Sequence, residues 1–524
     1  MSSVFDRALT DHEQIDALLT SEFLRRAAVL LEPERAPTKG GRPRAHAVWI
    51  ALVFDALICV LGSARKVEAE LIHTQKPWLA RRIEEAAREM FDSDGCDVLR
   101  RPDLVTDPRM RRQQYVYYMH RFILPRLDEI RQLQREFSVE VAMRAGIATP
   151  ETSGGVSHPS PSNVLFADGK VFKSMHKPPR RVVSKETGEV RTRRFDPDAE
   201  FVPTGGESDP QIVEILDGQT MPELHPADGT VAGTSNDQDS PHPAPKPKST
   251  NWAHGHPFVF THVRGDGRNM RVILDFERAP RAGGEMKHAM AALVRTVHSG
   301  LTLDAVAYDA AARGKHRADL YNHGIQLIAP PVAAANGENA ENNLGPHTLN
   351  HVDGTKTQIT IVTVAQLPRL LTHDVNGNPI LHPLTRTKTQ VRRNKSRPIG
   401  QPGAYTWYAQ WKTDDGSHVW IRLSPDAKTP HDTQRAEHIS SIPRGDPDYP
   451  AAYGRRNDAE SHHRQIDDAM TRERLPMKGE SRVTAHVHAW QWLQNAQTDW
   501  LCRMADAPQL ADGPPPEMAA PQAA

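Results

Sequence analysis

The stretch LDAVAYDAAARGKHRADLYNHGIQLIAPP, residues 303–331, decides the expected fold. An apolar run at 303–308 is followed by Asp309 and by a basic segment with helical character at 312–322. Gly324 then precedes a second apolar run at 325–328, which two prolines, Pro330 and Pro331, follow. Short apolar runs bounded by such breaks are typical of buried strands, and glycine commonly ends a helix. The stretch therefore predicts a strand, a helix and a strand, with an acid where the first strand ends.

Further strands are expected before this unit. An apolar run at 163–167 leads directly to Asp168. Residues 258–263 and 270–275 predict two strands joined by the turn sequence RGDGR, and 285–298 have the periodicity of an amphipathic helix. The resulting order β, β, β, α, β, α, β predicts an α/β fold with a mixed sheet flanked by helices.

The sequence on either side divides into further expected regions. Residues 1–150 have helical periodicity, and 336–445 contain strand-like pieces within a Gly/Thr/Asn-rich stretch. Residues 203–250 are rich in Pro, Gly, Ser and Asp, which predicts a disordered insertion. The expected regions are an all-helical N-terminal domain (1–150), an α/β core in two parts (160–335 and 446–505), a β-rich insertion between those two parts (336–445) and a disordered tail (506–524).

Two helices near the N-terminus could contact DNA. The apolar segment 45–61 is followed by Gly62 and Ser63, which end one helix and cap the next. The second helix carries Arg65 and Lys66 in its first turn. A tight glycine-containing turn between two helices is compatible with a helix-turn-helix, although such pairs also occur as purely structural elements.

The composition is typical of a soluble protein in a reducing cytoplasm. The mean hydropathy is −0.59, and the most apolar segment, 45–61, is short for a membrane span and contains Asp55. The start MSSVFDRALTDHEQ has no cationic segment before an apolar one, so no signal peptide is expected. Three cysteines, Cys59, Cys96 and Cys502, are too few and too scattered for a disulfide framework.

The charges are balanced overall but unevenly distributed. The chain has 65 basic and 65 acidic residues, yet 170–194 contain nine Lys/Arg and two Glu. Residues 386–397 contain six Lys/Arg and no acid, whereas 195–240 contain eleven acids and no Lys/Arg. Because phosphates respond to the local electrostatic field, a net charge of zero does not exclude a nucleic-acid partner. The alternative is that these runs are solvated surface.

Three acids are placed as metal-dependent phosphoryl transfer requires. Asp168 and Asp309 each end an expected strand, so their carboxylates would meet at one edge of a sheet. Glu460 lies on a late helix expected at 458–472. Carboxylates are ligands of Mg²⁺, and two ions about 4 Å apart can stabilise both the attacking and the leaving oxygen.

Sequence blocks around these acids resemble those of bacterial insertion-sequence transposases of the DDE type. The blocks are FADGKVFKSMHK around Asp168, the stretch 303–331 around Asp309, and YGRRNDAE, which ends at Glu460. In the last block Tyr453, Arg456 and Glu460 have the family's Tyr-Arg-Glu spacing. The segment GRPRAHAVWIALVFDALI is also similar to the family's N-terminal domain. The resemblance covers most of the chain apart from 203–250 and the tail.

The resemblance implies an RNase H-like catalytic core and a cut-and-paste reaction. It implies that Asp168, Asp309 and Glu460 hold two Mg²⁺ ions, for which Mn²⁺ can substitute, and that a homodimer acts on terminal inverted repeats and target DNA. It further implies an enzyme associated with the nucleoid, without a membrane partner. The implied or suggested DNA contacts are Tyr453, Arg456, Arg464, Lys170, Lys173, Arg42, Arg44, Arg65 and Lys66. Two alternatives stay open: a metal-dependent nuclease on the same fold, and a decayed or domesticated transposase that only binds DNA.

One position departs from the family pattern. The family has Lys seven residues after the third acid, where it contacts DNA phosphate, and this chain has Asp467 there. Arg464 lies on the same expected helix face as Glu460, so Arg464 or Arg456 is the expected replacement. The alternative is that Arg464 only pairs with Asp467 or Asp468.

Several histidines and tryptophans are expected to be structural. His254, His256 and His262 lack accompanying cysteines, and we expect them at the surface of a strand. His486 and His488 are two residues apart on a helix expected at 482–504, so they face different sides. Trp490, Trp492 and Trp500 on this helix are expected in its packing rather than in base stacking.

Overall fold

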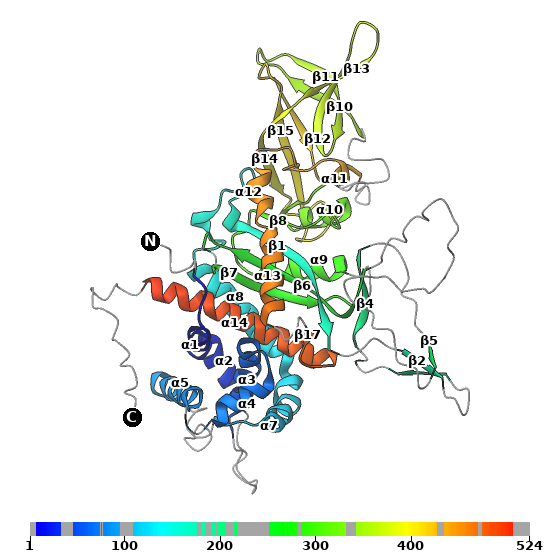
Figure 1. Ribbon diagram of the computed structural model, residues 1–524. Helices are drawn as coiled ribbons and strands as arrows, with labels where there is room; N and C mark the ends of the chain where they lie inside the picture. Colours follow the sequence, from blue (N-terminus) through cyan, green and yellow to red (C-terminus); the bar gives the residue numbers. More distant parts are fainter. Residues whose placement is uncertain are drawn as a thin grey trace.

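The fold was examined in a computed structural model of the chain (Figure 1). The structure describes residues 7–32, 46–73, 75, 77–94, 108–175, 180–183, 190–193, 196, 198–205, 214–216, 251–267, 269–280, 285–331, 342–426, 434–469 and 474–506. Arg42 and Arg44, Cys96, most of 203–250 and all but one residue of the tail lie outside these ranges. The molecule is a mixed α/β structure with a helical layer at one end, a central sheet, and a second sheet at the other end (Figure 1).

The central sheet is mixed. Its main strands lie in the order β7 (Arg271–Arg278), β6 (Asn251–Arg264), β1 (Val164–Ser174), β8 (Ala305–Ala307) and β9 (Gln326–Ile328). β1, β8 and β9 are parallel, while β6 is antiparallel to both β1 and β7. Two short strands extend it, β4 (Glu200–Gly205) beside β6 and β17 (Arg474–Leu475) beside β1. The expected mixed sheet flanked by helices is therefore confirmed.

The N-terminal helices share a hydrophobic core with this sheet. The helices are α1 (Asp11–Leu19), α2 (Glu22–Leu31), α3 (Val48–Leu61), α4 (Ala64–Ile72), α5 (Trp78–Asp94), α7 (Arg112–Tyr118) and α8 (Leu127–Arg144). One continuous cluster of buried apolar side chains extends from Ile15 in α1 through Phe260 in β6 to Ala496. Among the described residues no single helix is long and apolar enough to cross a membrane. Only α3 and α4 taken together meet both criteria, and the chain bends by 111° between them.

The last helix, α14 (Glu480–Asp506), closes an open edge of the sheet. β7 pairs with β6 on one side only, so its outer backbone groups need other partners. Asn495 accepts from Ile273 N at 2.9 Å and donates to Ile273 O at 2.8 Å, and Gln491 donates to the same carbonyl. Thr498 donates to Arg271 O. α14 therefore replaces a neighbouring strand.

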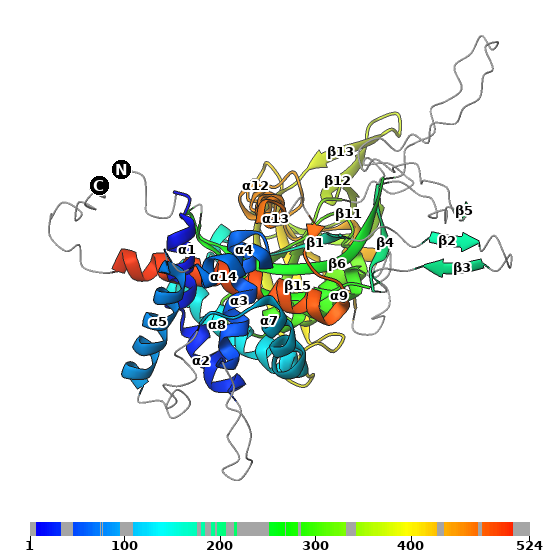
Figure 2. The same ribbon diagram turned by 60° about the horizontal axis from the view of Figure 1, so that its bottom comes forward.

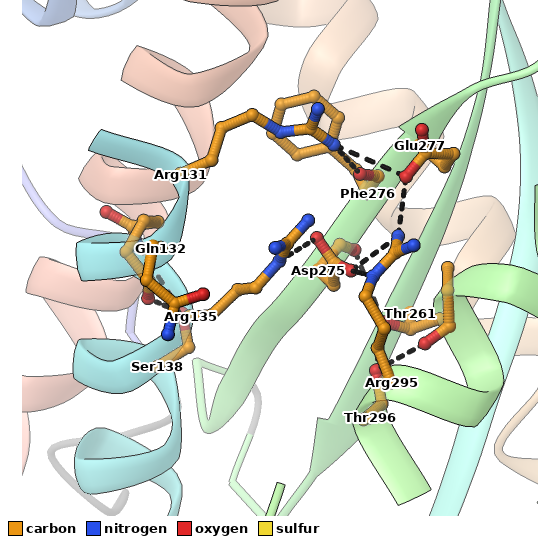
Figure 3. Close-up of polar contacts among 12 residues, drawn as sticks. Arg131, Gln132, Arg135, Ser138, Thr261, Asp275, Phe276, Glu277, Arg295 and Thr296 are labelled. Atoms are coloured by element: carbon orange, nitrogen blue, oxygen red, sulfur yellow. Dashed lines mark hydrogen bonds and ion pairs between the residues drawn. The ribbon is translucent and has the colours of Figure 1, made fainter. Parts of the chain in front are cut away.

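Ion pairs join α8 to β7 and to helix α9 (Glu285–Val297) (Figure 3). Asp275 on β7 accepts from Arg135 of α8 and from Arg295 of α9, each at 2.9 Å. Arg131 of α8 donates to the Phe276 carbonyl and to Glu277. Because Asp275 is 5% exposed and holds two guanidinium groups, the helical layer is tied to the sheet by charge as well as by apolar contact.

A second sheet is inserted between β9 and the helices that follow it. Its strands lie in the order β13 (Pro379–Pro383), β12 (Leu367–His373), β11 (Lys356–Val364), β10 (Asn342–Asn350), β16 (His418–Arg422), β15 (Tyr405–Lys412) and β14 (Thr385–Arg393). Trp407 and Trp411 lie in its core, and Tyr321 of helix α10 (Gly314–Asn322) packs on Trp407. The short helices α11 (Gln434–His438) and α12 (Tyr449–Gly454) and then α13 (Asn457–Ala469) return the chain to the first sheet.

Three sequence expectations are corrected here. β1 is longer than expected, so Asp168 lies in the middle of a strand and not at its end. Within 203–250, residues 203–205 and 214–216 form strands rather than disordered chain, and a hairpin of β2 (Arg180–Val183) and β3 (Val190–Arg193) stands away from the sheet with β5 (Glu214–Leu216) beside it (Figure 2).

The third correction concerns the histidines of β6. His256 and His262 are fully buried, not at the surface. His256 contacts Asp196 at 3.0 Å, and His262 packs against Phe166 and His462. His256 and His262 lie on the same face of β6 by alternation. Helix α13 covers that face through His462, while α9 covers the other face, where its Thr296 contacts Thr261. An alternating strand pattern alone does not distinguish that situation from one exposed face.

Candidate active site

Asp168 lies on the central strand, β1, at the position where its parallel neighbour β8 ends. Its side chain is 12% exposed, and Gly169 N donates to its Oδ1 at 3.0 Å. Burial, opposed by Arg456 and reinforced by Asp309 and Glu285, raises the pKa of Asp168 to about 6. The carboxyl group is still mostly ionised near pH 7, but its charge is less favourable here than in water.

Asp309 follows β8 and lies level with Asp168. The register pairs Phe166 with Ala307, and each acid comes two residues later in the chain, Asp168 still on β1 and Asp309 just beyond β8. Asp309 Oδ1 accepts from Ala311 N at 2.9 Å, which turns the chain away from the sheet. Residues at equal distances from a paired position lie side by side on parallel strands. The register therefore brings the first two acids close together at one edge of the sheet.

Arg456 links these two acids to the third. Its guanidinium lies 3.4 Å from Asp168 Oδ1 and 3.8 Å from Glu460 Oε1. Burial lowers the pKa of Arg456, but Asp168, Tyr453, Asp309 and Glu460 together raise it above its usual value. The guanidinium therefore lies where the fields of all three acids overlap.

Glu460 differs from the other two acids in its exposure. Its side chain is 72% exposed, on the first turn of α13. Arg264 of β6 pairs with Asp458, and Arg271 of β7 donates to Asp458 O and Ser461 Oγ, which fixes the start of this helix over the sheet. Within the described ranges, no three Asp, Glu, His or Cys side chains stand close enough together to hold a metal ion.

Glu285 is a fourth acid at this place, and the sequence analysis did not single it out. It begins α9, and Tyr308 donates to its Oε1 at 2.7 Å. Its carboxyl group lies against Gly169, where a Cβ would approach Glu285 Cδ to 2.7 Å. Burial raises the pKa of Glu285, and Asp309 raises it further. No neighbour of Glu285 in the sequence marks it, since only folding brings Gly169 and Tyr308 to it.

Lys170 and Asp467 form an ion pair across β1 and α13. The Lys170 Nζ lies 2.5 Å from Asp467 Oδ2 and 3.4 Å from the His463 carbonyl. Asp467, which departs from the family pattern, is thus neutralised by a cation two residues after the first acid. Arg464 is exposed and, among the described residues, pairs with neither Asp467 nor Asp468.

His463 and Tyr453 complete the surroundings of Asp168. His463 Nδ1 lies 3.9 Å from Asp168 Oδ2, and burial together with Lys170 and Arg456 lowers the pKa of His463 to about 3. The ring is therefore neutral near pH 7. Tyr453 stacks on Tyr449 with ring centroids 4.9 Å apart, and Tyr449 packs in the small core beneath β8 and β9.

The remaining candidate residues lie elsewhere. Arg65 and Lys66 are exposed on α4, whose N-cap Ser63 accepts from Lys66 N, and Gly62 before it has a φ of 79°. Arg65 also lines a shallow cavity of about 440 Å³ with Glu68 and His73. Lys173 lies near the end of β1, where its backbone pairs with Arg474 of β17.

Comparisons with known proteins add no relative. No protein-family model, no curated protein and no solved structure matches this chain. The functional interpretation therefore depends on the sequence blocks and on the geometry described above.

Proposed function

We propose that this chain is a DDE transposase with an RNase H-like catalytic core, which cleaves DNA at the ends of its element and joins those ends to a target. The strand order β7–β6–β1–β8–β9, in which β6 runs opposite to the other four strands, supports that core. The first acid on the central strand, the second after the adjacent strand and the third on a helix beyond an inserted sheet agree with the same architecture.

The observation that carries the proposal is the position of Arg456. It comes from the Tyr-Arg-Glu block, yet it contacts Asp168, which precedes it by 288 residues. Glu460 and Asp309 act on the same guanidinium. Glu460 is a near neighbour of Arg456 in the sequence, so the contact between Arg456 and Asp168 is the one that sequence position does not explain.

The donor chemistry of the site fits Mg²⁺. Carboxylate oxygens are its preferred ligands, and Asp168, Asp309 and Glu460 would hold it only after their side chains rearrange, because they do not form a metal-sized cluster among the described residues. Arg456 already places one positive charge among these acids, and the raised pKa of Asp168 marks a carboxylate short of positive partners. Two bound ions would supply electrophilic stabilisation of the attacking and leaving oxygens.

The side chains around the acids have separable roles in this proposal. Arg456 and Tyr453 bind the DNA phosphate nearest the cut, since guanidinium and phosphate match in geometry. His463, being neutral and largely buried, limits water access to one side of Asp168. Lys170 keeps Asp467 from adding negative charge. The substrates would be terminal inverted repeats and target DNA, with a homodimer pairing the two ends.

The proposal is tested with Asp309→Asn on linear DNA that contains the ends flanking the gene. Wild-type protein should nick this DNA with Mg²⁺ and not with EDTA. Asp309→Asn should lower nicking by at least about 10³-fold, because one ligand of the transition-state charge is lost, while DNA affinity changes by less than about threefold. Asp319→Asn, an exposed acid on the following helix, is the matched control and should nick normally.

Three outcomes would contradict the proposal. Equal loss of binding and nicking in Asp309→Asn would make this residue structural. Nicking without joining of pre-cut ends to a second DNA would indicate a nuclease on the same fold. Binding without any Mg²⁺-dependent nicking by the wild-type protein would indicate a decayed transposase.

A further inference from the structure

One face of the inserted sheet is basic over three neighbouring strands. Tyr408 pairs with Arg422, Gln410 pairs with both Lys388 and Trp420, and Arg392 pairs with Thr406, so these side chains share a face. Lys412 follows by alternation on β15. We call this set the basic face: Lys388, Arg392, Tyr408, Lys412, Trp420 and Arg422. The opposite face carries Trp407, Ala409 and Ile421, which are buried in the core of the inserted sheet.

The positive charge of the basic face is largely uncompensated. β14, β15 and β16 contain no Asp or Glu. Lys388, Arg392 and Lys412 are exposed, and none of them pairs with an acid in the described part of the chain. Arg422 alone has an acidic partner, Asp426 at 3.0 Å. Three free cations on adjacent strands would bind a polyanion rather than an isolated carboxylate.

The aromatic rings of the basic face support its cations. Lys388 Nζ lies 5.3 Å from the centroid of the Trp420 ring, and Arg392 Cζ lies 5.5 Å from that of Tyr408. These contacts restrict two long side chains in extended positions along the sheet. Because the ring faces are covered by cations, they are not open platforms for nucleic-acid bases.

The basic face is joined to the candidate active site through β14. Arg386, near the start of that strand, is 3% exposed and pairs with Asp446 and Asp448. Those two acids directly precede α12, which carries Tyr453. A ligand held on the basic face therefore lies on a sheet that these ion pairs join to the start of α12.

We propose that the basic face binds the phosphate backbone of double-stranded DNA without regard to sequence, and so holds target or flanking DNA rather than the terminal repeats. Phosphate contacts position DNA but do not specify its sequence, and covered ring faces leave no base readout. This inference rests on the proposed function only in naming the bound DNA as target or flanking DNA. Its test measures DNA binding in EDTA, where no cleavage occurs, so the inference can fail while cleavage at element ends succeeds.

The test uses the full chain and a labelled 20-bp duplex of arbitrary sequence, with affinity measured by fluorescence anisotropy at several salt concentrations. The Lys388→Glu/Arg392→Glu double variant should weaken binding by at least about tenfold near 0.1 M salt. It should also flatten the salt dependence by about two phosphate contacts. Arg121→Glu/Lys478→Glu, which makes the same charge change at exposed positions outside the inserted sheet, should retain most of the affinity.

A second variant tests the role assigned to the rings. Trp420→Leu removes the support under Lys388 and should weaken duplex binding by about two- to fivefold without preference for single strands. Unchanged duplex binding by the double variant, or equal loss in the Arg121→Glu/Lys478→Glu control, would overturn the proposal. A defect confined to single-stranded DNA or RNA in Trp420→Leu would also overturn it, because it would mean that bases stack on the ring.

Discussion

At the scale of single residues, the main feature of the site is a buried carboxylate beside a guanidinium. Asp168 is shielded from water while Asp309 and Glu285 add negative potential. Arg456 offsets that potential only in part, since the pKa of Asp168 stays at about 6 despite a contact of 3.4 Å. The site as folded is therefore short of positive charge.

The first prediction concerns the pH dependence of stability without divalent ions. A carboxyl group whose pKa is raised on folding favours the folded state below its unfolded value near 4, and this contribution is lost as pH rises through about 6. A difference of about two pKa units between the unfolded and folded states corresponds to about 3 kcal/mol of stability. In EDTA, wild-type protein should therefore lose about this much stability relative to Asp168→Asn between pH 4 and 7, measured by urea unfolding. A difference between the two proteins that does not vary with pH would contradict it.

The second prediction concerns Arg456 and metal affinity. Removing its charge with Arg456→Gln should strengthen Mn²⁺ binding to the protein alone by about tenfold or more, because a unit charge about 4 Å away is worth roughly 4 kcal/mol in a medium of effective dielectric 20. Free Mn²⁺ is measured by electron paramagnetic resonance. Arg455→Gln is the control, since Arg455 pairs with Asp266 and Gly265 O instead. Weaker Mn²⁺ binding by Arg456→Gln would show that Arg456 supports the site.

At the scale of elements, an ion pair joins β1 to α13, and the sequence alone does not predict which residues form it. Asp467 was one of the two acids with which Arg464 could pair. Its partner is Lys170, which reaches it from β1. Helical spacing identifies neighbours within one helix, but it carries no information about which strand passes beneath that helix.

A charge exchange tests this pair, and it is our third prediction. Asp467→Lys places two lysines together where Lys170 is 13% exposed, and should lower the free energy of unfolding by about 2 kcal/mol. The Lys170→Asp/Asp467→Lys double variant reverses the pair and should recover more than half of that loss in urea unfolding. Additive losses in the double variant would show that the two residues do not interact.

The sequence predicted the unit around Asp309 well because every signal there was local. β8, α10 and β9 all fall within the expected segments, and Gly324 has the φ of 83° that a helix-ending glycine adopts. It did not predict the full length of β1 or four strands of the inserted sheet: β10, β12, β13 and β14. These strands are rich in Thr, Pro, Arg and Asn, so their identity depends on pairing with neighbours rather than on apolar content.

The candidate site was predicted in part, for the same physical reason. Asp168, Asp309, Arg456 and Glu460 belong to recognisable blocks. Glu285 lies in an amphipathic helix with no distinguishing neighbour, and only its contacts with Gly169 and Tyr308 bring it to the site. Contacts made by folding cannot be read from spacing along the chain.

At the scale of the whole molecule, the helical layer and the central sheet depend on each other through α14. Asn495 is fully buried, and its amide bonds both backbone groups of Ile273. Ser138 of α8 accepts a further hydrogen bond from Asn495 at 2.8 Å. One side chain thus joins the sheet edge, the last helix and the N-terminal layer.

The fourth prediction follows from that junction. Asn495→Ala leaves Ile273 N without a partner in a buried place and should lower the free energy of unfolding by about 2 kcal/mol. Gln494→Ala, which changes the adjacent and partly exposed amide, should have an effect below about 0.5 kcal/mol. Both are measured by urea unfolding. Similar losses in the two variants would show that the edge contact contributes nothing specific.

The closure of β7 by α14 also has a consequence for how the protein is made. A ribosome delivers β7 long before α14, so during synthesis this strand has an unprotected edge. Until α14 emerges, that edge can pair with another nascent chain, which is a route to aggregation. Chains interrupted before α14 should therefore precipitate or be degraded rather than persist as partial proteins. Any catalytic activity would thus be confined to chains translated through the last helix.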